Sequence, residues 1–173
     1  MKKIIRKLPI WVLMVWPYII FLGMLVPNAS FFGIYCLLTL LLCVVNIVNA
    51  CKYTGENTAK ELSLWGMVTK LVHMPFYVAV MLFSAMLIMS IASGAGISQV
   101  PPIVLFLIIF AFFFMITSSL YCAKAAMAGH EKGVIKKEHA MMFSICSFMF
   151  VGDIICAILI FSKIKQNKKV KKG

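Results

Sequence analysis

Five long apolar runs constrain this chain more than any other feature of its sequence. They cover residues 8–26, 31–50, 75–97, 101–123 and 140–162. Each holds roughly 19 to 23 residues, so at about 1.5 Å per residue a helix would match the roughly 30 Å hydrocarbon layer of a membrane. Because backbone amides in lipid must be hydrogen-bonded within their own segment, each run is predicted to be a helix.

The composition supports a chain that is solvated largely by lipid. Hydrophobic residues make up 63% of the chain and charged residues 13%, whereas soluble domains usually carry about 25% charged residues. At 173 residues, no segment outside the apolar runs is long enough to build a core of its own. We therefore expect one all-α domain over residues 1–173, a polytopic transmembrane helical bundle.

The polar stretch between the second and third runs is predicted to form an amphipathic helix over residues 58–73. Thr58 and Glu61 match a capping box, which starts helices. At about 100° per residue, one side of this helix is apolar and the other polar. The apolar side carries Leu64, Trp65, Val68, Leu71 and Val72, and the polar side carries Lys60, Ser63, Gly66, Lys70 and His73. We expect it at the membrane interface, with Trp65 toward lipid and the lysines toward headgroups; a plain helical linker is the alternative.

The net charge of +12 is a membrane feature rather than a nucleic-acid footprint. Lysines and arginines flank the apolar runs, with four before the first run and six in the basic tail of residues 163–173. Such flanks contact anionic headgroups and set orientation. We expect the lipid bilayer as partner, together with self-association or another membrane protein, and no nucleic acid. The composition resembles that of small bacterial inner-membrane proteins, so we expect a multi-pass protein of the cytoplasmic membrane.

The number of crossings conflicts with the orientation that the basic residues predict for the chain in the membrane. With the N-terminus in the cytoplasm, both basic loops fall inside, as the positive-inside rule requires. Five full crossings, however, place the six lysines of the tail outside. The alternative is that the fifth run is a re-entrant hairpin that bends near residues 151–153 and returns the tail to the cytoplasm. Irregular backbone at that depth is tolerated where protein buries it.

Asp153 is the strongest candidate for an intramembrane site. It is the only aspartate and the only charged residue deep in an apolar run, where a carboxylate is costly and often functional. Thr39, Asn46 and Asn49 form a polar stripe on the second run and are candidate partners, as are residues 117–119. These residues are predicted to line a polar binding site, or to form buried hydrogen bonds that fix helix register.

The spacings of small residues predict close helix contacts. Ser90/Gly94, Ala92/Gly96 and Ser118/Cys122/Ala126 are small-xxx-small patterns. They would serve an accessory subunit that binds a membrane partner.

Motifs for catalysis are absent from the sequence. There is no CxxC, GxSxG, P-loop or ligand spacing for a metal, so we predict reduced cysteines and no cofactor. The favoured function is non-enzymatic, either a small transport or channel-type protein or an accessory membrane subunit. The alternative is a membrane-embedded enzyme that uses Asp153, or Cys122 or His139 at the cytoplasmic edge.

Overall fold

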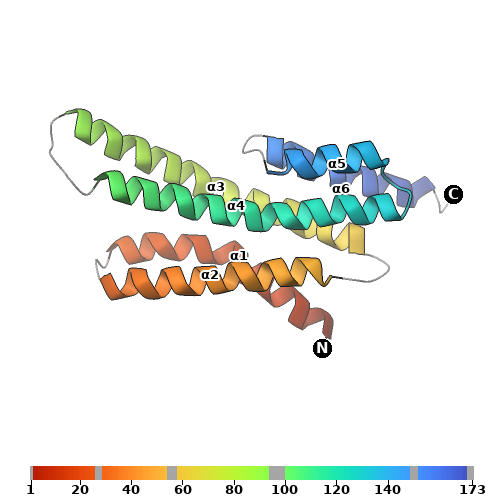
Figure 1. Ribbon diagram of the computed structural model, residues 1–173, viewed down its shortest axis with the longest axis horizontal. Helices are drawn as coiled ribbons and strands as arrows, with labels where there is room; N and C mark the ends of the chain where they lie inside the picture. Colours follow the sequence, from red (N-terminus) through yellow and green to blue (C-terminus); the bar gives the residue numbers. More distant parts are fainter. Residues whose placement is uncertain (1, 26–28, 54–57, 94–99, 149–151, 171–173) are drawn as a thin grey trace.

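The computed structural model describes residues 2–25, 29–53, 58–93, 100–148 and 152–170, and within them it holds six helices and no strand (Figure 1). The helices are α1 (Lys2–Leu25), α2 (Ala29–Cys51), α3 (Thr58–Ala92), α4 (Val100–Glu131), α5 (Lys137–Cys146) and α6 (Gly152–Val170). The prediction of an all-α bundle is confirmed.

Three of the described helical segments are long and apolar enough to cross a membrane. They are Ser30–Cys51, Thr58–Ala92 and Val104–Glu131, and α1 adds the shorter apolar segment Lys7–Phe21. The exterior of these helices is rich in large apolar side chains; Leu37 and Met81, for example, are 69% and 70% exposed. Lipid is the solvent that suits such a surface, so the chain is a membrane protein.

The helices pack as two hairpins against a central pair. The long helices α3 and α4 make the most extensive contact in the bundle. The α1–α2 hairpin lies along one side of this pair, and α5 and α6 lie along the other, with α5 against α4 and α6 against α3 (Figure 1). The α5–α6 pair covers only one end of the central helices, and this placement defines the candidate site.

The prediction of a separate interfacial helix over residues 58–73 is corrected. The helix begins at Thr58 as predicted, but it continues without a break to Ala92. Its polar side faces the bundle, since Ser63, Lys70 and His73 are buried. The reason is packing: the polar side carries Gly66, which lets α4 approach closely, and its polar side chains find hydrogen bonds there.

The fifth apolar run is not a single helix. Residues 140–162 are divided between α5, which ends at Cys146, and α6, which begins at Gly152. At ten residues α5 is about 15 Å long, half of what a crossing requires. The two helices run in opposite directions side by side (Figure 1). A single unbroken helix over this run is thus wrong, and a hairpin is the shape that the re-entrant alternative predicts.

The hairpin changes where the basic residues lie. The start of α1, the end of α2, the start of α3, the α4–α5 turn and the end of α6 lie toward the same end of the bundle (Figure 1). Most lysines and arginines of the sequence occur in or beside these segments. We call this end of the bundle the basic end. A re-entrant hairpin would place the lysines of the tail on the same side of the membrane as the two basic loops.

The turn between α4 and α5 depends on Gly133. Its φ is +67°, the left-handed region, and the amides of Gly133 and Val134 donate to the carbonyls of His130 and Gly129 at 2.8 and 2.9 Å. These bonds form a Schellman motif that ends α4. Gly133→Ala is expected to cost about 1 kcal/mol of unfolding free energy, because L residues are strained at this φ. Thermal unfolding in detergent would measure it, and an unchanged melting temperature would contradict this account.

Candidate functional site

Lys70 is the most unusual polar group in the described bundle. Its side chain is 1% exposed, and it lies about 18 Å along α3 from the start of that helix. Its Nζ donates to the Ser119 hydroxyl of α4 and to the Ser147 carbonyl after α5, both at 3.3 Å. The Ser119 hydroxyl also donates to the same Ser147 carbonyl. One buried ammonium therefore joins three segments of the chain.

The Ser147 carbonyl is suited to receive a positive charge. Ser147 is the C-cap of α5, and its amide and hydroxyl bond to Phe143. The last carbonyls of a helix lack partners within the helix and form the negative end of its dipole. A cation at a helix C-terminus is stabilised by about 0.3–2 kcal/mol, and hydrogen bonds to a charged group contribute about 1.5–3 kcal/mol each. Together these offset the roughly 3 kcal/mol cost of placing lysine at a membrane-helix centre.

A close approach of α3 and α4 brings this cluster together. A Cβ on Gly66 would lie 2.6 Å from Cys122 Sγ and 3.3 Å from the Cys122 amide nitrogen, so only glycine fits between the two helices. Gly66 precedes Lys70 by about one turn, and the Cys122 thiol lies beside the ammonium. The small-xxx-small pattern of Ser118, Cys122 and Ala126 is buried at 0% exposure, as expected for a close contact.

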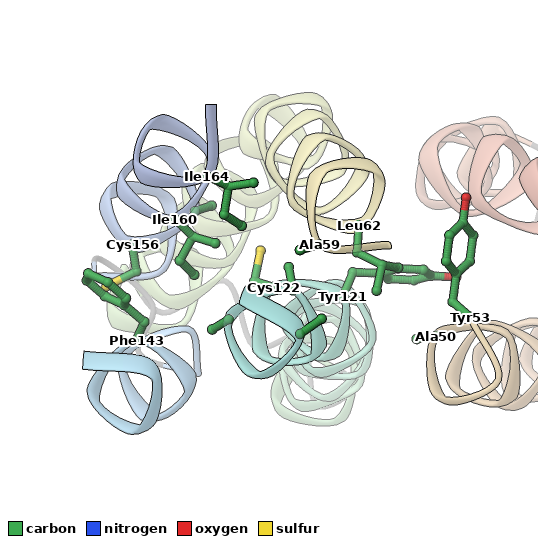
Figure 2. Packing of buried hydrophobic residues seen from close by; sticks show 14 of the residues in the cluster. Ala50, Tyr53, Ala59, Leu62, Tyr121, Cys122, Phe143, Cys156, Ile160 and Ile164 are labelled. Atoms are coloured by element: carbon green, nitrogen blue, oxygen red, sulfur yellow. The ribbon is translucent and has the colours of Figure 1, made fainter. Parts of the chain in front are cut away.

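Figure 2 shows how neighbouring residues of α4 serve different contacts. Tyr121 points toward Ala50 of α2 and toward Tyr53, which follows that helix. The sulfur of Cys122 points toward the side of α3 and α6. Cys156 and Phe143 join α6 and α5 at the edge of the same core. The candidate site is thus the inner face of the α5–α6 hairpin.

His73 connects α3 to α1 at a position where Pro17 interrupts the backbone hydrogen bonds of α1. Pro17 has no backbone N–H, so the Leu13 carbonyl four residues earlier loses its helical partner. His73 Nε2 lies 2.9 Å from that carbonyl and carries the proton, because a carbonyl can only accept. His73 is 0% exposed, and its Nδ1 has no hydrogen-bond partner among the described residues. This bond is a structural link between α1 and α3.

The polar stripe of α2 faces inward, and its side chains bond to other helices. Asn46 Nδ2 donates to the carbonyls of Pro9 and Leu42 at 3.1 and 2.9 Å, and the Tyr121 hydroxyl donates to Asn46 Oδ1 at 2.9 Å. Asn49 Nδ2 donates to the Tyr121 hydroxyl at 3.2 Å. These contacts agree with the alternative in which the polar stripe forms buried hydrogen bonds that fix helix register. The asparagines meet Tyr121, which the sequence reasoning did not consider as a partner.

Thr39 occupies a separate position nearer the other end of α2. Its hydroxyl accepts from Trp16 Nε1 at 2.6 Å and donates to the Tyr35 carbonyl at 2.7 Å. The Tyr35 ring stacks on Trp16 and its hydroxyl donates to the Trp16 carbonyl. Thr39 therefore joins α1 to α2 and does not meet the Lys70 cluster.

Asp153 is the second residue of α6, and its side chain lies outside the described residues. Of its expected partners, Asn46 and Asn49 bond to Tyr121, and Ser119 bonds to Lys70 and Ser147. Asp153 therefore lies in the first turn of α6 and not in the middle of a continuous helix over residues 140–162.

Cys122 and His139, two of the residues considered for catalysis, lie in different environments. Cys122 is fully buried, while His139 is an exposed residue that stacks on Phe143. His130 Nδ1 lies 3.2 Å from the Ile135 carbonyl and supports the α4–α5 turn. Among the described residues no three His, Cys, Asp or Glu side chains form a metal-binding group.

Lys70 was missed because a lysine in an amphipathic stretch normally points to water. The available signal was Gly66, Lys70 and His73 on one side of the helix. A glycine within a polar helical face marks a place where another backbone comes close, and the polar residues beside it are then buried rather than exposed.

Comparison with known proteins gives a match to a protein family. The sequence profile of a family of unknown function, DUF6652, matches residues 10–166. No curated protein and no solved structure matches the chain. The matched residues include Lys70, Ser119 and Ser147, so the candidate site lies wholly within the region shared with the family.

Proposed function

This chain belongs to the family of unknown function DUF6652, and we propose that it is a non-enzymatic membrane protein of the transport type that conducts protons through Lys70. The observation that carries the proposal is a single buried amine bonded to the broken segment between two short helices. Ionisable residues inside membrane bundles mark ion and proton paths. Discontinuous helices that meet within a bundle form the sites of many transporters.

The surroundings of Lys70 suit a single ammonium group that can gain and lose a proton. Among the described residues its acceptors include the Ser119 hydroxyl and the Ser147 carbonyl oxygen, which are oxygen types that also line cation paths. In the proposed cycle, Nζ binds a proton from one side of the membrane and releases it to the other. Only the N–H bond forms and breaks. Ser119 stays bonded to Ser147 meanwhile, so the site keeps its shape when the amine is neutral.

Orientation follows from the basic end. We place this end in the cytoplasm of a bacterial cell, with its lysines against anionic headgroups of the inner membrane, because positive residues are retained on that side. Lys70 then lies in the cytoplasmic half of α3, and the α5–α6 hairpin enters from the cytoplasmic side.

Lys70→Met tests the proposal. Methionine keeps the length and apolar stem of lysine, and replacing a buried charge by an apolar residue of similar volume is often neutral for stability. In liposomes that contain the purified protein and a pH-sensitive dye, under a potassium diffusion potential, we expect wild-type protein to admit protons. Lys70→Met is expected to slow this flux about tenfold or more, the effect of a barrier raised by about 1.4 kcal/mol.

Lys60→Met is the matched control, because Lys60 is an exposed lysine of the same helix. The proton flux of this variant should stay near the wild-type value. A melting temperature of Lys70→Met close to wild type would show that the fold is intact. Equal flux in Lys70→Met and wild type, or a wild-type flux no greater than that of empty liposomes, would refute the proposal.

An accessory subunit is the second candidate, and the interior contacts of α2 favour it. Asn46 and Asn49 are engaged with Tyr121, as in a bundle whose polar groups serve assembly. That function predicts that Lys70→Met restores every phenotype of a strain lacking the protein, which the proton-conducting function does not.

A further inference from the structure

A second site lies away from Lys70, between the halves of α3 and α4 that are farthest from the basic end. There the structure has a cleft of about 420 Å³, within the usual range for small-molecule sites. Tyr77, Ser84 and Ala85 line it from α3, and Ala111 and Phe112 line it from α4. Its walls are almost wholly apolar and it faces the lipid side of the bundle.

Ser84 and Tyr77 are the lining residues of this cleft that carry a hydroxyl. The Ser84 side chain is 8% exposed, and its Oγ has no hydrogen-bond partner among the described residues. An unsatisfied buried hydroxyl costs about 1–3 kcal/mol, and inside a membrane water is not present to satisfy it. A ligand that brings one hydrogen-bond acceptor to Oγ would recover this free energy.

The depth of Ser84 selects the kind of acceptor. Ser84 is near the middle of the apolar run 75–97 and eight residues, about 12 Å, before the last residue of α3. The ester carbonyls of phospholipids lie at the boundary of the hydrocarbon layer and do not reach this depth. A carbonyl that resides within the layer must belong to a more lipophilic molecule.

We infer that this cleft binds a lipophilic carbonyl compound of the isoprenoid-quinone type, with one ring carbonyl accepting a hydrogen bond from Ser84 Oγ. Tyr77 and Phe112 supply aromatic surfaces for a flat ring. The apolar walls and the surrounding lipid accommodate the tail. Ala85 and Ala111 leave the room that larger side chains would fill. This inference is independent of the role of Lys70.

Thermal unfolding of the full-length protein in detergent, titrated with decylubiquinone, tests the inference. A ligand that binds the folded state raises the melting temperature, and we expect such a rise for wild type. Ser84→Ala should weaken binding about 2–10-fold, the loss of one neutral hydrogen bond. Ala85→Phe should abolish the rise, because its ring occupies the cleft. Ala85 is exposed, so this substitution leaves the core intact.

Val78→Phe is the matched control, since Val78 is an exposed residue of the same helix that does not line the cleft. The melting temperature of this variant should respond to decylubiquinone as that of wild type does. Decane has the tail but no carbonyl, so it should raise the melting temperature less than decylubiquinone does. This smaller rise should be the same in Ser84→Ala and in wild type. The inference is overturned if decylubiquinone does not stabilise wild type, or if it stabilises Ala85→Phe equally. It is also overturned if the purified protein carries a phospholipid that decylubiquinone does not displace.

Discussion

Gly66→Leu is expected to prevent the central helices from packing and to cost about 3 kcal/mol or more of unfolding free energy. A Cβ at this position already lies 2.6 Å from Cys122 Sγ and 3.3 Å from the backbone nitrogen of Cys122. Neither atom can move easily, because Cys122 is fully buried and its backbone belongs to α4. Equilibrium unfolding in bicelles would give the free energy, and the yield of folded protein after detergent extraction would fall in parallel.

Gly33→Leu is the control for this substitution. Gly33 is an exposed glycine of α2, and a Cβ added there would have no atom of a neighbouring segment within 4 Å. Leucine there should contact lipid and leave stability unchanged or slightly higher, since glycine is a poor helix former. If both leucine variants lose stability equally, the close contact of α3 and α4 is not the cause.

The origin of the clash can be tested by a double-mutant cycle. Gly66→Ala alone should cost about 1–3 kcal/mol. Cys122→Ala removes the sulfur that lies nearest, so the alanine at 66 should cost less in that background. The rescue should be partial, because the Cys122 backbone nitrogen remains. A cost at Gly66 that does not change when Cys122 is replaced would mean that the helices separate for another reason.

Much of the fold follows from patterns that the sequence displays locally. Long apolar runs predict helices because lipid leaves the backbone no other partners, and Thr58 with Glu61 marked the start of α3 correctly. The division of the fifth run did not follow in this way. Residues 140–162 are apolar throughout apart from Asp153 and a few small polar residues, and hydropathy alone does not tell a crossing from a hairpin buried on protein. The distribution of charge favoured the hairpin, because a fifth crossing would separate the lysines after residue 162 from the other basic segments.

The candidate site could be predicted less well, since it depends on contacts between distant segments. Asn46 and Asn49 were correctly expected to face inward, but Tyr121 was not foreseen as their partner because 72 residues or more separate them. Lys70 was assigned to headgroups from the amphipathic pattern of its own helix. Which side of an amphipathic membrane helix meets protein depends on the neighbour, and here the neighbour offers Ser119 and the end of α5.

His73→Leu is expected to destabilise the bundle by about 1–3 kcal/mol, the cost of leaving a buried carbonyl without its donor. The carbonyl is that of Leu13, which Pro17 deprives of a helical partner, and His73 Nε2 donates to it at 2.9 Å. Equilibrium unfolding in bicelles would measure the loss. His73→Gln, whose amide can also donate, should recover part of it.

The dependence on Pro17 gives the decisive form of this test. In a Pro17→Ala background, residue 17 has an N–H that can bond to the Leu13 carbonyl within α1. The carbonyl then has a donor whether or not His73 is present. His73→Leu should therefore cost less in Pro17→Ala than in wild type, by about 1 kcal/mol. An equal cost in the two backgrounds would mean that the histidine stabilises α3 through its ring contacts with Tyr77 and Phe114 instead. A smaller cost would establish that a proline in one helix is the reason for a buried histidine in another.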